Sequence, residues 1–579
     1  MNAILLSPGP AGPSLIRSRT HYGWPLAERS ESLTATLPEP AVRHPEASPR
    51  CASRRELWAI ALLLLVAAAA VYGPHVFSGG FTVDDYGHAV GVDHPRDGIL
   101  QDYWQVTSNR PGLVIYIPLT HVVFGPHPSL HIALAILLAV LMSTTLYALM
   151  RRLAFAPIHA SAVAVLVLLF PWSDSSVFWA VAGHISLAIA FGLGGVILAL
   201  RGLEARADGR RRRGRQLHAG AVALYALSVL TYETAAVALL FAGALYLTHA
   251  SWPVVRRRWI VDVAVILPCL VWNATRADRE RPSLDAMIDH AGAIADAGGT
   301  VFAWAALPFG EADREVVLLV LLAVICAAAV VRMLLPRPDE ARPVLGRWIA
   351  MAGAGVLIAA ATWVLYIPAD PYYSPTTPGV GNRVNVMAAV GVVIGVYAVV
   401  VLGATLLFRG LPGWKRAASS LSVAVAAVLA IGYAADVRSD QQAWARAETE
   451  ADAVLDAIQA TVPNPPPGSV IYTFGHPGNE RPGISIFGST WDLLGAVQLR
   501  YDDPGLRAYP VLDGTTISCL KDGLGPQGPG DWSPERYGAR YGSAYFVNVS
   551  SVTAGRIDSR EQCEIALPSY VPGPVVRVP

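Results

Sequence analysis

The chain has 579 residues, of which 53% are hydrophobic and only 15% are charged, and its formal net charge is +1. Charged residues make up roughly a quarter of a typical soluble protein, so this composition argues against a soluble enzyme. Repeated apolar runs of about 17 to 25 residues account for the excess, and each is long enough to cross a bilayer. We therefore expect a polytopic membrane protein, and nothing in its charge indicates a nucleic-acid partner.

The N-terminal residues 1–55 are rich in Pro, Ser and Arg and show no hydrophobic periodicity, which predicts a disordered tail. The first apolar run begins only near Leu57 and lacks a clear cleavage site, which is not typical of a secretory signal. Arg54 and Arg55 directly precede that run. Because Lys and Arg accumulate on the cytoplasmic side of membrane spans, they place the tail inside and the next loop outside.

Later basic groups extend this orientation along the chain. If all of them are cytoplasmic, an even number of crossings must separate each group from the next. The groups are Arg151 and Arg152, Arg201 with Arg210–Arg213, Arg256–Arg258, Arg332 with Arg337 and Arg342, and Arg409 with Lys415 and Arg416. This condition predicts about eleven spans in a membrane domain of residues 56–436. The later spans are expected at residues 259–275, 316–335, 348–367, 384–408 and 417–435.

Two polar interruptions do not fit straight single spans. Pro171–Ser176 divides one apolar stretch, and Thr231–Thr234 lies in the middle of the run 219–247. Pairs of helices of about 13 to 15 residues would reach only about 20 Å, so their tips would need a cavity rather than lipid. This interpretation places Asp174 and Glu233 at the floor of an outward-facing cavity. The alternative is one long tilted helix with Glu233 at mid-membrane.

The chain changes character beyond residue 436. A polar helix is expected at residues 439–460, strands at 470–474, 485–487 and 544–549, and a second helix at 491–499, with Gly, Pro and Asp between them. We therefore expect residues 437–579 to form a small extracytoplasmic α/β domain, and we find no catalytic motif in it.

The five cysteines are few. Cys269 and Cys326 lie in apolar runs and are expected to serve packing. Cys519 and Cys563 lie in the polar C-terminal region and can pair as Cys519–Cys563 if that region is extracytoplasmic. Their spacing alone leaves the connectivity open.

An adjacent acid pair, Asp84 and Asp85, follows the first span after a few residues. Such a pair can supply a general base, hold a divalent cation through its oxygen atoms, or simply cap a helix. Arg110 and Arg383 end outer loops just before returning spans, where guanidinium groups can clamp a lipid phosphate. The alternative for both arginines is snorkelling at the membrane interface.

Further polar side chains fall on the same side of the membrane and are candidate substrate or cavity residues. They are His88, Asp174, His184, Glu233, Tyr372, Tyr373 and Asn382. The histidines show no metal-ligand spacing, so a structural role is the simpler interpretation. The two tyrosines can stack on a sugar ring or belong to the aromatic belt of the interface.

Together these features resemble the GT-C superfamily of integral-membrane glycosyltransferases, which use polyprenyl-phosphate sugars as donors. The resemblance covers residues 57–435 and rests on Asp84-Asp85-Tyr86 in the first outer loop and on the number of spans. Leu230-Thr-Tyr-Glu-Thr-Ala235 is similar to a Lys-Glu-containing hairpin of many such enzymes, with Tyr232 where Lys is common. The nearest types are the protein mannosyltransferases, the aminoarabinose transferases and the actinobacterial arabinofuranosyltransferases.

The resemblance implies a GT-C-like fold in a bacterial inner membrane and the inverting transfer of a hexosyl or pentosyl group to an extracytoplasmic glycan, lipid or protein. One carboxylate of Asp84 and Asp85 would deprotonate the acceptor hydroxyl. Arg110 and Arg383 would stabilise the leaving phosphate, with or without Mg²⁺, Mn²⁺ or Ca²⁺ on the acid pair; no other cofactor is implied. Two other functions remain open: a polymerase or ligase of lipid-linked glycans, and a transporter that uses Glu233 for coupling.

Overall fold

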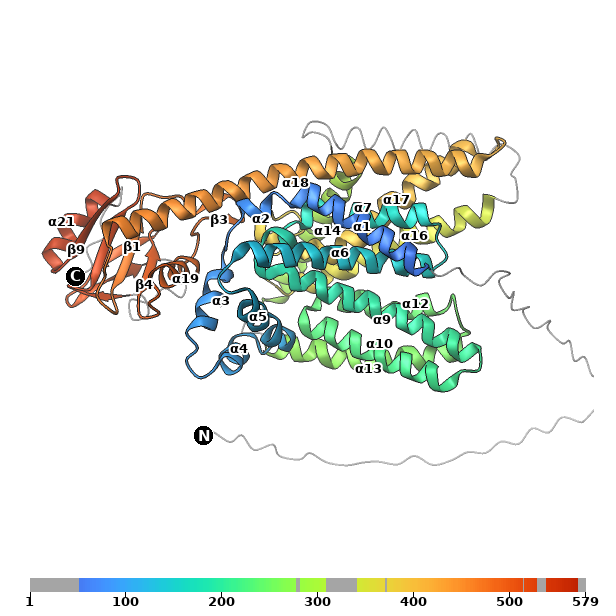
Figure 1. Cartoon of the computed structure of the whole chain (residues 1–579), viewed down its shortest axis with the longest axis horizontal. Coiled ribbons are helices and arrows are strands. Elements are labelled where there is room, and N and C mark those ends of the chain that lie inside the picture. Colours follow the sequence, from blue (N-terminus) through green and yellow to red (C-terminus); the bar gives the residue numbers. More distant parts are fainter. Residues whose placement is uncertain are drawn as a thin grey trace, which may run out of the picture. The chain divides into compact units, whose positions relative to one another are not determined.

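A computed structural model describes residues 52–276, 282–308, 341–369, 372–513, 515–527 and 538–570 (Figure 1). All of these residues belong to one compact unit, Pro49–Pro579. The expected tail falls almost entirely on residues 1–51, and the expected span at 316–335 falls within residues 309–340, so both predictions lie outside the described residues.

Helices dominate the described residues, and six of them are long and apolar enough to cross a membrane. They are α1 (Arg54–Tyr72), α6 (Pro128–Arg152), α9 (Gly183–Ala207), α16 (Ala341–Trp363), α17 (Val386–Phe408) and α18 (Trp414–Thr461). Two further apolar helices are shorter, α5 (Pro111–Phe124) and α7 (Pro157–Leu168). The chain is therefore a polytopic helical membrane protein. The expected total of about eleven spans also involves residues outside the described ranges.

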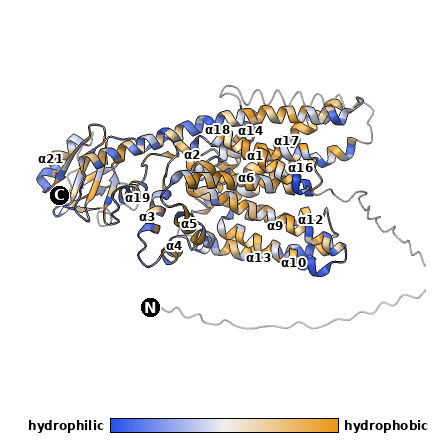
Figure 2. Cartoon of the chain, viewed as in Figure 1, coloured by the Kyte–Doolittle hydropathy of each residue, from blue (hydrophilic) through white to orange (hydrophobic). Residues whose placement is uncertain are grey.

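Large apolar side chains stay exposed in the middle of these helices. Leu62 of α1 is 62% exposed, Leu357 of α16 is 69% exposed and Ile431 of α18 is 69% exposed. Soluble proteins rarely leave contiguous apolar surface in water, so these helix faces suit contact with acyl chains. Figure 2 shows the pattern as hydrophobic colour along the helices, with hydrophilic residues at one end of α10 (Arg211–Thr231) and along the later part of α18.

The helices α1 and α6 form an antiparallel pair. Ser53 caps α1 by accepting a hydrogen bond from the amide of Glu56 at 3.1 Å. The Glu56 carboxylate accepts bonds from the Tyr147 hydroxyl at 2.5 Å and from Arg151 Nε at 2.6 Å, both on α6. The start of α1 thus lies at the end of α6. The expectation that a returning span follows Arg110 directly is wrong, because α5 has only 14 residues and reaches about 21 Å.

The first predicted interruption is present between α7 and α9. A series of short turns occupies residues 169–182 and includes the four-residue helix α8 (Ser175–Phe178). Pro171 lacks a backbone N–H to donate to a helix, which fits a break at this point. The limbs of this hairpin are unequal, since α7 has 12 residues and α9 has 25. The expected length of about 13 to 15 residues is therefore wrong for α9.

The second interruption is also confirmed. α10 (Arg211–Thr231) stops where Tyr232 takes an extended conformation with φ −159° and ψ 128°. Two five-residue helices, α11 (Ala236–Leu240) and α12 (Ala242–Tyr246), then lead back. The alternative of one long helix through Glu233 is wrong. α10 itself is longer than expected, with 21 residues, because its helix extends into the basic cluster.

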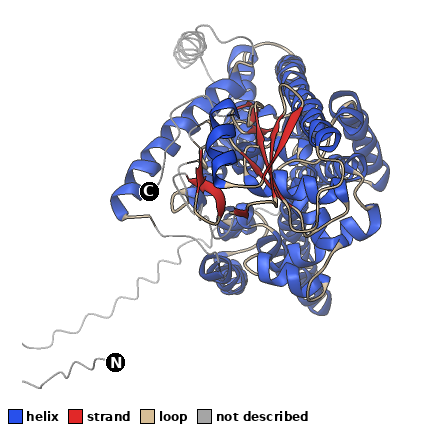
Figure 3. Ribbon diagram, turned by 90° about the vertical axis from the view of Figure 1, so that its left-hand side faces the viewer, coloured by secondary structure: helices blue, strands red, loops and turns tan. Residues whose placement is uncertain are grey.

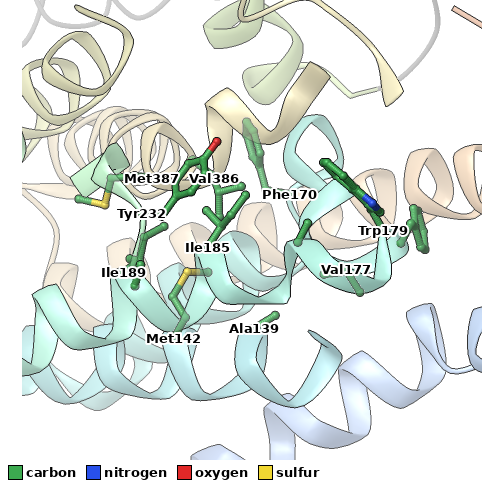
Figure 4. Packing of buried hydrophobic residues seen from close by; sticks show 14 of the residues in the cluster. Ala139, Met142, Phe170, Val177, Trp179, Ile185, Ile189, Tyr232, Val386 and Met387 are labelled. Carbon is green, nitrogen blue, oxygen red and sulfur yellow. The ribbon is translucent and has the colours of Figure 1, made fainter. Parts of the chain in front are cut away.

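The interruptions are held by a continuous apolar core. Ala139 and Met142 of α6, Ile185 and Ile189 of α9, and Val386 and Met387 of α17 belong to one buried cluster (Figure 4). Phe170 and Trp179 come from the turns between α7 and α9, and Tyr232 comes from the second interruption; all three belong to the same cluster. Residues at helix breaks are thus fixed by packing, which suits a site built from them.

α18 is one unbroken helix of 48 residues, about 72 Å long. It contains both the expected span at 417–435 and the expected polar helix at 439–460, and it continues through the expected domain boundary after residue 436. Its polar half contacts α19 (Thr490–Tyr501), β2 (Asn479–Arg481) and β3 (Ile484–Ser485). The C-terminal region is therefore attached through a helix and not through a loop.

The C-terminal region contains a four-stranded sheet in the order β4-β1-β8-β9. Its central strand β1 (Val470–Phe474) is buried throughout and runs parallel to β4 (Arg507–Pro510) and β8 (Ala544–Asn548). β9 (Thr553–Ile557) is antiparallel to β8, and α19 connects β1 with β4 on the chain. Figure 3 shows these strands grouped among helices. The expected strands at 470–474 and 544–549 and the helix at 491–499 are confirmed.

A second sheet carries a disulfide. Three antiparallel strands follow the order β5 (Thr516–Cys519), β6 (Gly523–Gln527) and β7 (Ala539–Arg540). Cys519 at the end of β5 is joined to Cys563 of α21 (Arg560–Tyr570), with a Cα–Cα distance of 5.9 Å. Cys269 keeps its thiol and is half-buried in α13 (Trp252–Arg276), whereas Cys326 lies outside the described residues.

Candidate active site

A cavity of about 550 Å³ lies where α3 (Asp84–Asp93), α4 (Ile99–Thr107) and α5 meet the turns before α9 and the start of α19. Its charged and aromatic lining residues are Asp84, His88, Asp102, Tyr103, Arg110, Trp179, His184, Tyr232, Arg383 and Trp491. Five residues that the sequence singled out therefore line one cavity: Asp84, His88, Arg110, His184 and Arg383. We call this space the Asp84 cavity.

The two adjacent acids have different surroundings. Asp84 lines the cavity, whereas Asp85 is 1% exposed and does not. Asp85 Oδ2 accepts a hydrogen bond from the amide of Thr82 at 3.1 Å, and its Oδ1 accepts one from the amide of Val181 at 2.9 Å. Asp85 thus ties the start of α3 to the turns before α9. Asp84 is therefore placed to face a substrate, whereas Asp85 holds the backbone around it in position.

The backbone just before the pair is strained. Val83 has φ 49° and ψ −110°, a conformation that a β-branched residue rarely adopts. Such outliers cost about 1–3 kcal/mol and persist only where the surrounding structure enforces them. The hydrogen bonds that Asp85 accepts from the amide of Thr82, directly before Val83, and from the amide of Val181 in a distant turn supply that enforcement. As a result, Asp84 lines the cavity from the first turn of α3.

The pKa of Asp84 is raised above the ordinary value of 3.8. Burial of the carboxylate is the main cause, whereas the charge of Arg383 and a hydrogen bond from Trp491 lower the pKa and offset part of the rise. A carboxylate with a raised pKa is a stronger base than one in water, yet it remains ionised once the pH exceeds that pKa. The site can therefore accept a proton at Asp84.

Arg110 is held by the tip of the second hairpin. Its Nε donates to Glu233 Oε2 at 2.8 Å and its Nη2 donates to Glu233 Oε1 at 2.5 Å, which is a bidentate pair. The Arg110 guanidinium also lies 4.3 Å from the ring centroid of Tyr232. Glu233 itself does not line the cavity. It therefore orients Arg110 rather than facing a ligand directly.

Arg383 is presented by the loop η5 (Gly379–Asn385). Its Nη1 donates to the carbonyl of Val380 and its Nη2 donates to the Tyr373 hydroxyl, both at 3.0 Å. A guanidinium has five N–H donors, so these two bonds use only part of its capacity. The group also lies 5.1 Å from the ring of Trp179. Arg383 is thus fixed in the cavity wall with its charge beside Asp84.

The loop that carries Arg383 is fixed by a close backbone contact with the C-terminal region. The amide of Val380 donates to the carbonyl of Gly483 at 2.8 Å. Gly379 has φ +60°, and a Cβ at this position would collide with the same carbonyl. Only glycine fits both the backbone conformation and the approach. The position of Arg383 therefore depends on the hairpin of β2 and β3.

Two histidines line the cavity as neutral or weakly polar groups. Burial lowers the pKa of His88 to about 4, so its ring is neutral near pH 7. His88 stacks on Tyr103 with ring centroids 5.6 Å apart. His184 places Nδ1 2.6 Å from the carbonyl of Val181 and leaves a buried Nε2 without a partner among the described residues. That nitrogen is available to a ligand in the cavity.

The C-terminal region contributes one lining residue, Trp491, which sequence reasoning did not select. Trp491 lies at the start of α19, where Ser489 and Asp492 form a capping box. The pKa of Asp492 is raised to about 7, mainly by burial. The pattern Ser-Thr-Trp-Asp was visible in the sequence as a helix start, but it carried no sign that the helix would dock on α3. Trp179 and Tyr103 were likewise not selected.

Other predicted residues lie elsewhere. Asp174 and Asn382 line a second cavity of about 850 Å³, which we call the Asp174 cavity. Asn382 Nδ2 donates to Asp174 Oδ1 at 2.6 Å, and Asp174 Oδ2 is buried without a partner among the described residues. Tyr373 contacts Arg383 but lines neither cavity, and Tyr372 is 42% exposed. The expected floor of a single cavity is thus divided between two.

A metal on the acid pair does not fit this geometry. Both oxygen atoms of Asp85 accept hydrogen bonds from backbone amides, and no cluster of three or more His, Cys, Asp or Glu side chains suited to a metal occurs among the described residues. Hard cations such as Mg²⁺ and Ca²⁺ need several oxygen ligands. We therefore derive no chemical step from a metal ion.

Fold and site together define a polytopic helical membrane protein with a cavity that combines the carboxylates of Asp84 and Asp102 with two arginines. No protein-family model matches the chain, and no curated protein sequence is significantly similar to it. ArnT from Cupriavidus metallidurans in the apo state is 15% identical, with 79% of this chain and 86% of that chain covered and a TM-score of 0.39. ArnT bound to undecaprenyl phosphate is 14% identical, with coverages of 78% and 85% and a TM-score of 0.38. Similarities this low do not define the fold or the activity.

Proposed function

We propose that the chain is an integral-membrane glycosyltransferase that takes its sugar from a polyprenyl-phosphate donor, as the resemblance to the GT-C superfamily implies. The observation that carries the proposal is that Asp84 lines one cavity with Arg110 and Arg383. A base and a cationic phosphate site within one cavity are what such a transfer requires. Residues 56–436 would form the catalytic membrane domain, and residues 437–579 an extracytoplasmic domain that closes the cavity through Trp491.

The transfer would be a direct inverting displacement. The acceptor hydroxyl oxygen attacks the anomeric carbon while the bond from that carbon to the phosphate oxygen breaks. The hydroxyl proton passes to the carboxylate of Asp84, whose raised pKa supports this role. The bonding pair of the broken bond stays on the phosphate, which leaves as a polyprenyl phosphate with one more negative charge than it had in the donor.

The developing charge on that phosphate would be stabilised by the arginines. Arg383 lies in the cavity wall with N–H groups beyond those bound to Val380 and Tyr373. Fixed donors aimed at a developing charge are usually the largest single contribution to catalysis, because they need no reorganisation during the reaction. Arg110 would act beside it, although its bidentate pair with Glu233 leaves it less free to follow the phosphate.

The acceptor would be an extracytoplasmic glycan, lipid or protein, and the protein would lie in a bacterial inner membrane with its N-terminus in the cytoplasm. Glycosyl transfer is tested with the full chain in liposomes, supplied with radiolabelled polyprenyl-phosphate sugars and a panel of acceptors. We expect a time-dependent product and an equivalent release of polyprenyl phosphate. Flux of sugar into the liposomes without product would instead identify a transporter.

The orientation is tested separately by the accessibility of single cysteines. A cysteine introduced at the exposed Asp97 should react with an impermeant maleimide from outside intact cells. A cysteine introduced at the exposed Arg212, at the start of α10, should react only after permeabilisation. Labelling with the opposite pattern would place the Asp84 cavity in the cytoplasm and remove the proposed use of an extracytoplasmic acceptor.

A further inference from the structure

A third cavity, of about 550 Å³, lies at the opposite end of α10 and is separate from the Asp84 cavity. Its charged lining residues are Arg206 of α9, Arg211, Arg215 and His218 of α10, and Arg258 of α13. None of its lining residues, all of them described, is acidic. We call this space the Arg258 pocket. Its excess of positive charge indicates an anionic ligand.

Arg258 is the most informative residue of this pocket. It is only 6% exposed, and its Nε and Nη2 atoms have no hydrogen-bond partner among the described residues. Its nearest acid is Asp262, with Nε 3.7 Å from Oδ2. A buried guanidinium with unsatisfied N–H groups is costly unless a ligand or water supplies acceptor atoms. The pocket into which Arg258 projects is where such acceptors fit.

Asp262 forms an ion pair with Arg258 but does not accept a hydrogen bond from its Nε or Nη2 atoms, and its oxygen atoms face other donors. Its Oδ2 accepts a hydrogen bond from the Tyr246 hydroxyl at 2.7 Å, and its Oδ1 lies 3.3 Å from His218 Nε2. Tyr246 in turn exchanges a hydrogen bond of 2.7 Å with Tyr225. This buried network fixes Asp262 behind the guanidinium. No ion pair of Arg206, Arg211 or Arg215, which also line the pocket, occurs in the part of the chain that the structure describes.

The pocket exists because α9 and α10 approach closely at two glycines. A Cβ on Gly214 would lie 2.9 Å from the carbonyl oxygen of Gly202, and a Cβ on Gly202 would lie 3.2 Å from that of Gly214. A Cβ on Gly202 would also lie 3.5 Å from Arg258 Nη1. A side chain on Gly214 would push the helices apart, and a side chain on Gly202 would occupy space beside Arg258. The pocket is therefore built into the helix packing.

The depth of the pocket points to the membrane surface. The lining residues of α10, from Arg211 to His218, lie about 20–30 Å along the helix from Tyr232, which lines the Asp84 cavity. The larger of these distances matches the roughly 30 Å hydrocarbon thickness of a bilayer, so the Arg211 end of the pocket lies at the headgroup level of the opposite leaflet. Next to it, Ile260 is 55% exposed and Leu267 is 44% exposed on α13, which gives acyl chains an apolar surface.

We propose that the Arg258 pocket binds the phosphate of an anionic phospholipid headgroup in the leaflet opposite the Asp84 cavity. The phosphate oxygens accept hydrogen bonds from the Arg258 guanidinium, whose planar fork matches them. Arg211 and Arg215 add charge at the mouth, as basic pockets between membrane helices do for acidic lipids. The acyl chains lie along α13. This site is independent of the proposed glycosyl transfer.

The test measures lipid binding to the full chain by native mass spectrometry in a neutral detergent. Phosphatidylglycerol, phosphatidylcholine and inorganic phosphate are titrated separately. The variant R211Q/R215Q removes two exposed arginines of the pocket, so the fold is retained; R212Q/R213Q removes the same charge from exposed neighbours that do not line it. We expect the pocket variant to bind phosphatidylglycerol about tenfold more weakly, and the control to change less than about twofold.

Two results would overturn the proposal. Equal losses in R211Q/R215Q and R212Q/R213Q would mean that only the overall charge of this end attracts the lipid. The pocket would be a site for a soluble anion if inorganic phosphate displaced phosphatidylglycerol and raised the thermal stability of the protein to the same extent as the lipid. Phosphatidylcholine, which carries a phosphate but no net charge, should bind no more tightly to the parent chain than to the pocket variant.

Discussion

The Asp84 and Asp174 cavities both border the interruption between α7 and α9, yet they carry different charges. Trp179 from this interruption lines the first cavity with two arginines, and Asp174 from the same interruption lines the second. The second cavity also holds Asp436 and Asp440, with Arg481 as its basic lining residue. Residues of one turn region thus contribute to two cavities with different charge. The first cavity balances Asp84 and Asp102 with Arg110 and Arg383, so two guanidinium groups are present to face a phosphate. The second cavity sets three acids against one arginine, and this excess of acids disfavours a phosphate.

The largest expected effect is that of Asp84→Asn, which removes the proposed base. We expect the rate of glycosyl transfer to fall about 10³-fold, because a positioned general base contributes about 10²–10⁴. Asp93→Asn is the matched control, since Asp93 is exposed at the other end of the same helix. Initial rates with a radiolabelled donor measure both variants. Transfer by Asp84→Asn at the parent rate would end the assignment of the base.

The next effect concerns Arg383. We expect Arg383→Gln to reduce kcat about 10²-fold, the order found when one fixed donor to a developing charge is lost. The kcat of Arg383→Lys should lie between those of the parent and of Arg383→Gln, because lysine keeps the charge but lacks the planar guanidinium. Arg481→Gln makes the same change in the Asp174 cavity and should alter kcat less than about threefold. A loss in Arg481→Gln as large as that in Arg383→Gln would contradict the division between the two cavities.

The pH profile is expected to follow Asp84. Its pKa is raised above the ordinary 3.8, so activity should rise with pH through an inflection that lies above that value. Arg383 lowers the pKa of Asp84, and Arg383→Gln should therefore move the inflection to higher pH. The effect on stability has the opposite sign: a raised carboxyl pKa favours the folded state below the unfolded pKa and this contribution is lost as pH rises. If the inflection does not move in Arg383→Gln, the charge of Arg383 does not influence the residue whose titration controls the activity.

The smallest effect is expected for Asp174→Asn. Asp174 lines the Asp174 cavity and not the Asp84 cavity, so the change to an amide leaves Asp84, Arg110 and Arg383 in place. The amide can keep an oxygen as acceptor for Asn382 Nδ2. We expect donor KM and kcat to change less than about threefold. A rate loss comparable with that of Asp84→Asn would show that the reaction takes place in the Asp174 cavity and not in the Asp84 cavity.

Much of this arrangement could be predicted from sequence, because it depends on hydrophobic length and on positions along the chain. The helical spans of the described residues, the breaks at Pro171–Ser176 and Tyr232, and the first strand of the C-terminal sheet follow from such patterns. The convergence of Asp84, Arg110 and Arg383 followed from placing three loops on one side of the membrane. These are consequences of local periodicity and of charge at the ends of spans.

Side-chain direction could not be predicted. Asp84 and Asp85 are equivalent as letters, and only the strained backbone at Val83 and the amide of Val181 separate their roles. Glu233 reads as a cavity acid, but a bidentate pair with Arg110 turns it into a positioning residue. The division of Asp174 from Asp84 depends on how the turns pack in the core. All of these are tertiary contacts between residues distant in sequence.

The continuous helix α18 was also beyond sequence reasoning. A switch from apolar to polar composition near residue 436 reads as a domain boundary, yet such a switch equally marks the point where one helix leaves the membrane. For the same reason the docking of α19 on α3 was not visible, and with it the place of Trp491 in the cavity wall.

In the proposed reaction, Asp84 accepts the proton of the acceptor hydroxyl while Arg383 holds the phosphate. The most direct test is equilibrium binding of a polyprenyl phosphate, the proposed leaving group, to purified Asp84→Asn and Arg383→Gln proteins. We expect Asp84→Asn to bind it at least as tightly as the parent, because a negative charge near the phosphate is removed. Arg383→Gln should bind it about tenfold more weakly. Equal binding by the parent and Arg383→Gln, or loss of binding in Asp84→Asn, would contradict the account.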